Sequence, residues 1–169
     1  MNVTFSSDTG LTFEDVQETS RLSERTFKTA HDAAQMRVAD EKTRWIFLHR
    51  PETDNVIKMD GKVIGFTFIV LTNTRIMRDF LSGKISEEDI FTLSKQVTKR
   101  TFTAIYLCAS VILPEFRRKG LALRGFVKQI RNVTGTKKPA LFYWGYSKEG
   151  ALLAEKVAKE SGLPVHARA

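Results

Sequence analysis

The spacing of hydrophobic residues changes several times along the chain, and each change marks an expected element. Residues 12–48 have helical composition and follow a possible short strand at residues 2–6. We expect two helices in this region, with a break near residues 29–32. Thr12 and Asp15 have the spacing of an N-terminal capping pair for the first of these helices.

Two runs of β-forming residues follow, at residues 55–59 and 63–71. They are separated by Asp60 and Gly61, a dipeptide that suits a type I′ turn because both central residues of that turn need positive φ. The pattern therefore predicts an antiparallel hairpin.

Residues 75–100 return to helical character. Within them, Ser86 precedes three acidic residues, which predicts a helix N-terminus whose carboxylates face the positive end of the helix dipole. We expect this helix to run to about Val97. Residues 102–113 are a long apolar run rich in β-branched residues, as expected for a central strand buried on both faces.

The last third of the chain alternates between helix and strand. Its pattern predicts a helix over residues 118–135, a buried strand at 141–144, a helix over 147–162 and a possible final strand at 163–168. The order of elements is that of a mixed α/β fold. No linker or repeat divides the 169 residues, so we expect one domain.

The formal charge of +8 is concentrated in one part of the sequence. Residues 95–138 contain eleven basic residues and one acid, so they carry +10 and the remainder sums to −2. This surplus is compatible with a solvated surface. It is also compatible with a site for a polyanion, such as nucleic acid, an anionic surface or a phosphorylated cofactor.

Several function classes are not favoured by the composition. A single cysteine excludes an intramolecular disulfide, and three scattered histidines give no metal-ligand motif. The sequence has no apolar run of 18 residues, and its start lacks the features of a signal peptide. We therefore expect a cytoplasmic protein with no metal and no membrane association.

The most informative stretch is residues 111–122, which joins the predicted central strand to a helix through a basic turn. A helix start offers unpaired N–H groups and the positive end of the dipole, so it can hold a phosphate. Gly120 would let a phosphate approach the backbone, and the small Ala122 would keep the same face open. The side chains at residues 117–119 (Arg117, Arg118 and Lys119) add positive charge.

This stretch resembles the acyl-CoA-binding signature of the GNAT superfamily of N-acetyltransferases, which is matched by Arg117, Gly120 and Ala122. The preceding residues 112–116 are similar to the approach to that signature, and the order of elements agrees along nearly the whole chain. The resemblance implies a central mixed, mostly antiparallel sheet flanked by helices, with 75–100 as a helical insertion between the hairpin and the central strand. It also implies acetyl-CoA as the acyl donor. The residues it places around coenzyme A are Val111, Ile112, Leu113, Arg117, Arg118, Lys119, Gly120, Leu121, Ala122 and Ser147.

Two departures from this family concern the chemistry. Many members have a tyrosine in the last helix that protonates the departing thiolate, but Ala158 stands at that spacing before Gly162. Many also carry an acid on the central strand, whereas residues 102–113 contain no carboxylate. The sequence therefore leaves the general base unidentified.

Three aromatic residues surround the second buried strand, where the acyl donor and acceptor are expected to meet: Tyr143, Trp144 and Tyr146. We take Tyr146 as the candidate general acid because it lies past the strand end, beside Ser147. The alternative is that these aromatics only form walls or core. Ser147 is expected to cap the last helix, and its hydroxyl could also contact the pantetheine arm.

The remaining candidates are weaker. Cys108 has no evident histidine partner and lies in mid-strand, where cysteine usually behaves as a small hydrophobe. Strand parity predicts that Tyr106, Cys108 and Ser110 share one face. A base from the first helices could still reach the acceptor; the residues considered there are His31, Glu41, His49 and Glu52.

These features favour transfer of an acetyl group from acetyl-CoA to a primary amine by direct attack. A non-catalytic acyl-CoA-binding regulatory domain is the first alternative. A basic nucleic-acid-binding module is less favoured, because the sequence has no helix-turn-helix or RNP-like pattern. The acceptor stays open among small-molecule amines, peptide N-termini, protein lysines and polyamines, and a homodimer also stays open.

Overall fold

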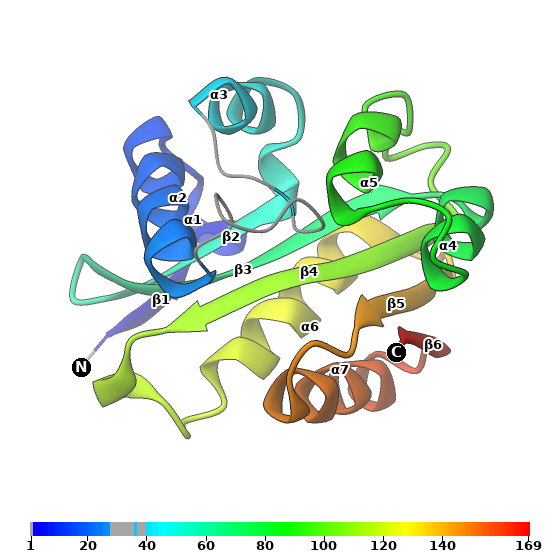
Figure 1. The fold of residues 1–169 in the computed structure, drawn as a ribbon. Helices are drawn as coiled ribbons and strands as arrows, with labels where there is room; N and C mark the ends of the chain where they lie inside the picture. The colour runs from blue at the N-terminus through cyan, green and yellow to red at the C-terminus, as the bar shows by residue number, and fades with distance from the viewer. Residues whose placement is uncertain (1, 28–35, 37–39) are drawn as a thin grey trace.

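The computed structural model describes residues 2–27, 36 and 40–169 (Figure 1). One six-stranded sheet runs through it with its strands in sequence order. The strands are β1 (Val3–Phe5), β2 (Asp54–Met59), β3 (Lys62–Thr72), β4 (Ala104–Ile112), β5 (Ala140–Trp144) and β6 (Val165–Arg168). The first four strands pair antiparallel, and β5 and β6 continue the sheet in parallel. The mixed, mostly antiparallel sheet is therefore confirmed.

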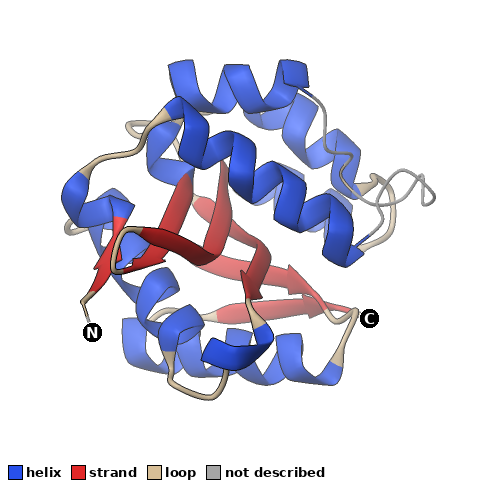
Figure 2. Cartoon of the chain, turned by 90° about the vertical axis from the view of Figure 1, so that its left-hand side faces the viewer, coloured by secondary structure: helices blue, strands red, loops and turns tan. Residues whose placement is uncertain are grey.

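Helices cover both faces of this sheet, as Figure 2 shows. The helices are α1 (Ser6–Thr9), α2 (Phe13–Phe27), α3 (Asp40–His49), α4 (Thr74–Leu81), α5 (Glu87–Ser94), α6 (Leu121–Thr134) and α7 (Lys148–Ser161), with 3-10 turns at η2 (Pro51–Thr53) and η3 (Pro114–Phe116). Helices α2 to α5 lie over one face, and α6 and α7 form the two crossovers on the other (Figure 1). Crossovers of this kind are what parallel neighbouring strands require.

Local sequence signals account for most element ends. Asp60 and Gly61 have φ of 50° and 82°, which confirms the type I′ turn. The Thr12 hydroxyl accepts the Asp15 amide at 3.1 Å, which confirms the capping pair. Ser86 forms a capping box at the start of α5.

Several expected bounds were wrong. The short strand ends at Phe5, and α1 follows it where no helix was expected. Helix α5 ends at Ser94, short of Val97. Helix α6 begins at Leu121, because Arg118 and Gly120 both have positive φ, which a right-handed helix excludes. The break expected near residues 29–32 lies outside the described residues.

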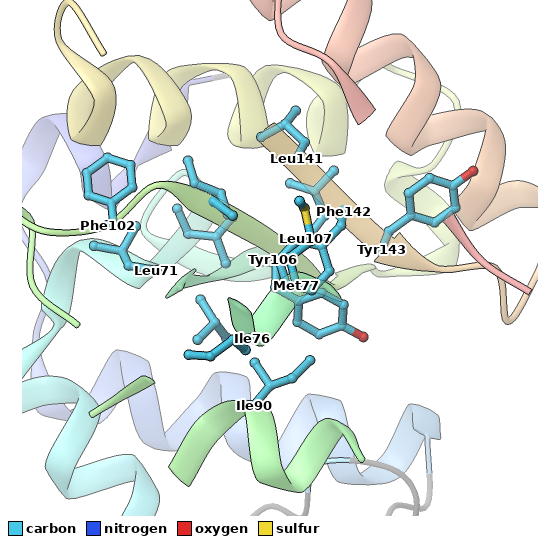
Figure 3. Close-up of a cluster of buried hydrophobic side chains, with 14 of the residues drawn as sticks. Leu71, Ile76, Met77, Ile90, Phe102, Tyr106, Leu107, Leu141, Phe142 and Tyr143 are labelled. Atoms are coloured by element: carbon cyan, nitrogen blue, oxygen red, sulfur yellow. The ribbon is translucent and has the colours of Figure 1, made fainter. Parts of the chain in front are cut away.

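Aromatic side chains fill the core between β4, β5 and the helical insertion. The Tyr106 ring lies 5.2 Å from Phe80 of α4 and 5.0 Å from Phe142 of β5, measured between centroids. Figure 3 shows this cluster, with Tyr143 at its edge and the Tyr143 hydroxyl pointing outward. The predicted insertion is thus part of the main core, because Phe80 is fully buried against the central strand.

A β-bulge at Cys108 changes which face each β4 side chain occupies. Ala109 pairs with Phe68 and Leu107 with Ile69, so Cys108 has no partner on β3. Tyr106 pairs with Val70, whereas Ser110 pairs with Thr67, and these two β3 residues lie on opposite faces. The expectation that Tyr106 and Ser110 share a face was therefore wrong, because the extra residue reverses the alternation.

Candidate functional site

Strands β4 and β5 separate shortly after they meet. Their parallel ladder covers only three pairs and ends at Tyr106 with Phe142, while β4 continues to Ile112 (Figure 1). Among the described residues, β5 makes no further pair with β4. The edge of β4 beyond Tyr106 therefore offers backbone N–H and C=O groups that can bind a ligand.

A cavity of about 280 Å³ occupies the opening between these strands. We call it the splay cavity. Its walls come from β4 (residues 107–110), from β5 and the following loop (Tyr143, Trp144 and Tyr146), and from the first two turns of α7. It is large enough for the pantetheine end of an acyl carrier and is closed below by Phe126 of α6.

The basic turn follows β4 directly and leads into α6. Gly120 occupies the N-cap position with φ 70° and ψ 16°, and no side chain caps the helix. The first amides of α6 are therefore available to an anion. A Cβ at Gly120 would meet nothing within 4 Å, so the glycine is required by its backbone conformation and not by close packing.

A groove of about 560 Å³ runs from this turn along α7. This turn groove brings together seven of the residues expected to bind the cofactor: Val111, Ile112, Arg117, Arg118, Gly120, Leu121 and Ala122. Leu113 and Lys119 are not among its lining residues. Leu113 packs against a separate cluster around Phe5, and Lys119 lies over the Phe116 ring.

Arg117 is held in place by the strand that precedes it. Its Nε donates to the carbonyl oxygen of Ile112 at 2.9 Å, while the side chain remains exposed. This hydrogen bond joins the basic turn to the end of β4. It therefore fixes the position of the α6 N-terminus relative to the free edge of β4.

Four cavities adjoin one another in series, because each shares lining residues with the next, and we call this series the path. The turn groove and the splay cavity share Ser110 and Leu153. The splay cavity shares Cys108 and Tyr146 with an inner cavity of about 90 Å³. That inner cavity shares Met36 and Ala109, among others, with a cavity of about 80 Å³ that we call the Asp54 cavity.

Tyr146 lines both the splay cavity and the inner cavity. Its side chain is 65% exposed, and its ring packs edge-on against Trp144 at 5.4 Å. Tyr143 differs, because its hydroxyl donates to Glu155 Oε1 at 3.3 Å, and burial together with the Glu155 charge raises the pKa of the phenol. Of the two, Tyr146 keeps its ring at the junction where an acyl group would lie.

Ser147 caps α7 as expected. Its hydroxyl accepts the Gly150 amide at 3.0 Å, and the side chain also lines the splay cavity. Ala158 is buried against the core, so α7 presents no hydroxyl at the position where many members of the resembled family have tyrosine. Contact of Ser147 with a cofactor stays a prediction.

Cys108 lies at the bulge, where it lines the splay and inner cavities. Burial raises the pKa of its thiol well above the usual range, and the charge of Glu87 raises it further. The thiol is therefore protonated at neutral pH, which removes the reactive thiolate form. This agrees with the expectation that Cys108 behaves as a small hydrophobe.

The weaker candidates for the base do not reach this path within the described residues. Glu41 and His49 are exposed on α3, and His49 stacks on Trp45. Glu52 lies in η2 and lines none of the four cavities. His31 lies outside the described residues.

Two buried carboxylates line the path, and sequence reasoning missed both of them. Glu87, at the start of α5, lines the inner cavity and is 9% exposed. It accepts the Tyr106 hydroxyl at 2.6 Å and the Met36 amide at 2.7 Å. In the sequence Glu87 is one of three acids after a capping serine, so its pattern suggested only a helix N-terminus.

Asp54, the first residue of β2, is the second buried carboxylate and is 6% exposed. Its Oδ2 accepts the Thr19 hydroxyl at 2.8 Å, while Oδ1 has no partner among the described residues. Burial raises the pKa of this carboxyl from 3.8 to about 7; the Thr19 hydrogen bond opposes the shift and the Asp15 charge adds to it.

The basic residues of 95–138 are spread over the two ends of β4 and over α6, where Arg124, Lys128 and Arg131 recur at helical spacing. Arg117 and Arg118 lie at the end of β4 and line the turn groove. Lys99, Arg100 and Lys137 lie at the start of β4, where the Lys137 amine donates to the Lys99 and Arg100 carbonyl oxygens. The nine residues of β4 put these two groups on the order of 30 Å apart.

The described residues contain neither a cluster suited to a metal ion nor a helix suited to span a membrane. No cluster of three or more histidine, cysteine, aspartate or glutamate residues there is arranged to hold a metal ion. None of the described helices is long and apolar enough to cross a membrane.

Comparisons with known proteins give similar solved structures only. No family model and no curated protein matches this sequence. The loading GNATL domain of CurA from Lyngbya majuscula is 16% identical with a TM-score of 0.47, and the match covers 78% of this chain and 58% of that one, less than two thirds of its length. The ribosomal-protein-alanine N-acetyltransferase from Brucella melitensis biovar Abortus 2308 is 12% identical with a TM-score of 0.39, and the match covers 99% of this chain and 79% of that one.

The buried carboxyl of Asp54 predicts a distinctive pH dependence of stability. The folded protein holds this proton more tightly than the unfolded chain, so its stability falls as the pH rises from about 4 through about 7. Asp54→Asn removes the titration. We expect its free energy of unfolding, relative to that of the wild type, to rise by about 2 to 3 kcal/mol between pH 5 and pH 8. Urea unfolding at several pH values measures this, and parallel profiles for the two proteins would contradict it.

Proposed function

We propose that this protein transfers an acyl group, most simply acetyl, from acyl-CoA to a primary amine. One observation carries the proposal: a series of adjoining cavities leads from an uncapped helix N-terminus, past the opening between β4 and β5, to a pocket with a buried carboxylate. The match of Arg117, Gly120 and Ala122 to the acyl-CoA-binding signature supports the same assignment.

The turn groove suits the phosphate end of coenzyme A. We expect the pyrophosphate to accept hydrogen bonds from the first amides of α6, where the helix dipole favours negative charge. Arg117 and Arg118 line the same groove and supply positive charge. The pantetheine arm would then run along the edge of β4 at residues 110–112 and hydrogen bond to its backbone, with Leu153 of α7 opposite.

The reacting carbonyl is expected near the bulge at Cys108, where the splay and inner cavities meet. A backbone N–H of β4 can polarise the thioester carbonyl there, because β5 no longer pairs with this stretch. A neutral amine attacks the carbonyl carbon, the new C–N bond forms and the C–S bond breaks. The amine loses one proton to a base or to solvent, and the departing thiolate gains one from the Tyr146 hydroxyl.

The distribution of positive charge bears on the alternative of nucleic-acid binding. A duplex needs a basic surface that follows its backbone, and Arg124, Lys128 and Arg131 of α6 could contribute to such a surface. Arg117 and Arg118, in contrast, line the turn groove, which suits a small phosphorylated cofactor, so the acyltransferase proposal accounts better for these two arginines.

The first test uses Gly120, which has open space around it and positive φ. Asparagine and aspartate both tolerate this conformation and have the same shape, so they differ mainly in charge. We expect Gly120→Asn to bind CoA within about fivefold of wild type. Gly120→Asp should bind at least about tenfold more weakly than Gly120→Asn, because its carboxylate lies where the phosphate must sit. Isothermal titration calorimetry with CoA measures both affinities.

A control for this test is Gly162→Asp at the end of α7. Gly162 has φ 67° and ψ 31°, close to the values at Gly120, and a Cβ there would meet nothing within 4 Å, so the backbone strain is similar. CoA affinity should be unchanged in this variant. Equal binding by Gly120→Asp and Gly120→Asn would mean that the phosphates lie elsewhere.

The second test concerns the proton donor. We expect Tyr146→Phe to lower kcat by about tenfold or more with little change in KM for acetyl-CoA, since the hydroxyl acts in the transition state. Tyr143→Phe is the comparison, because the Tyr143 hydroxyl is bonded to Glu155, and its kcat should change less than about twofold. Steady-state release of free CoA thiol measures both. If Tyr143→Phe loses activity and Tyr146→Phe does not, the proton donor is Tyr143 and the assignment to Tyr146 is wrong.

A further inference from the structure

The Asp54 cavity lies between helices α2 and α3 and the face of β2, β3 and β4 that these two helices cover. Its residues come from each of these elements and include Thr19, Ile46, Asp54, Phe68 and Ala109. It adjoins the inner cavity, with which it shares Met36 and Ala109 as lining residues, and so lies next to the cavities that we assign to the acyl donor.

One carboxylate oxygen of a residue that lines this cavity is buried without a hydrogen-bond partner among the described residues. This is Oδ1 of Asp54, whose other oxygen is bonded to Thr19. A buried carboxylate is costly unless a donor or a cation completes it, so the ligand that complements this oxygen is a positively charged N–H donor.

We propose that the Asp54 cavity binds the remote ammonium group of a short aliphatic diamine, whose other nitrogen is the one that receives the acyl group. The proposal rests on the acyl-transfer function above and names the acceptor class for it. The Asp54 carboxylate pairs with one end of the acceptor, and the carbon chain leads back to the thioester near Ala109.

The strand register sets the length of this acceptor. Asp54 pairs with Phe68 and Phe68 pairs with Ala109, so these three residues lie in one row across the sheet on the same face. Two strand spacings put Asp54 about 9 to 10 Å from Ala109. A hydrogen bond from the ammonium to Oδ1 takes up about 2.8 Å of this. The remainder is spanned by a chain of about four methylene groups.

The walls of the cavity suit such a chain. Val16, Ile46, Phe66 and Phe68 supply apolar surface for the methylene groups. The hydroxyl groups of Thr19, Ser20 and Ser23 lie at the same walls and can accept the remaining ammonium protons.

Other charged groups face the Asp54 region from the elements packed around it. Asp15 of α2 is paired with Lys58 of β2 at 2.9 Å. Lys42 of α3 lines the cavity and is paired with Glu88 of α5. Glu87 of α5 lies in the adjoining inner cavity and accepts two hydrogen bonds. The Lys42 charge is thus balanced by a carboxylate within the protein, while no cation of the described residues forms an ion pair with Asp54.

The first experiment measures binding to the wild-type protein by isothermal titration calorimetry, with 1,4-diaminobutane and 1-aminobutane as probes. They share the carbon chain and differ in the second ammonium group. We expect the diamine to bind at least about tenfold more tightly at pH 8. Its affinity should fall by about tenfold between pH 8 and pH 6, because the Asp54 carboxyl, whose pKa is raised to about 7, takes up a proton in this range.

The second experiment repeats the titrations with Asp54→Asn, which keeps the size of the side chain and removes its charge. We expect this variant to bind the diamine at least about tenfold more weakly at pH 8 and to bind the monoamine as the wild type does. The control is Asp79→Asn on α4, whose carboxylate pairs with Lys84 and does not line the cavity. If the wild-type protein binds the diamine and the monoamine with equal affinity, that result alone overturns the proposal, whatever the variants show.

Turnover separates this proposal from the function on which it rests. With acetyl-CoA, we expect Asp54→Asn to raise KM for 1,4-diaminobutane by about tenfold and to leave kcat and the monoamine kinetics nearly unchanged. If Asp54→Asn instead lowers kcat equally for both amines, Asp54 accepts a proton and does not anchor the acceptor, which overturns the proposal. Absence of CoA binding would contradict the acyltransferase function, while the calorimetric comparison of the amines would still decide whether the cavity takes a diamine.

Discussion

The early end of the ladder between β4 and β5 is the constraint on which the rest of the site depends. Three residue pairs hold the two strands together at Tyr106 and Phe142, where a cluster of aromatic rings fills the core. Beyond this point Leu107 to Ile112 of β4 have β3 on one side and the cavities on the other. A buried strand with one free backbone edge can recognise an extended polar ligand without any special side chain.

The sequence predicted the elements that have strong local signals. The Asp60–Gly61 turn, the Ser86 cap and the Ser147 cap all lie where their side chains and backbone requirements indicate. The basic turn was also recognisable, because Arg117, Gly120 and Ala122 follow an apolar strand directly. Its conformation was not, since the residue type of Arg118 gives no indication of the positive φ that the structure shows there.

The acidic half of the site could not be predicted, because it is assembled from distant segments. Asp54 precedes the hairpin and Glu87 belongs to a helix cap, and each looks like an ordinary surface acid in the sequence. Burial under α2, α3 and the insertion brings them to the path, and it raises the pKa of Asp54 to about 7. The bulge at Cys108 was missed for a similar reason. Whether a residue of β4 is left without a partner depends on the register between β3 and β4.

In the proposed function, the free edge of β4 and the N-terminus of α6 form one binding site for CoA. Hydrogen exchange with and without CoA tests this arrangement, because it reports on the backbone amides of both segments. We expect slower exchange in residues 107–113 and in 118–124 together, with no change around the basic residues Lys99 and Lys137. Protection confined to those distant basic residues, or to the turn without β4, would contradict it.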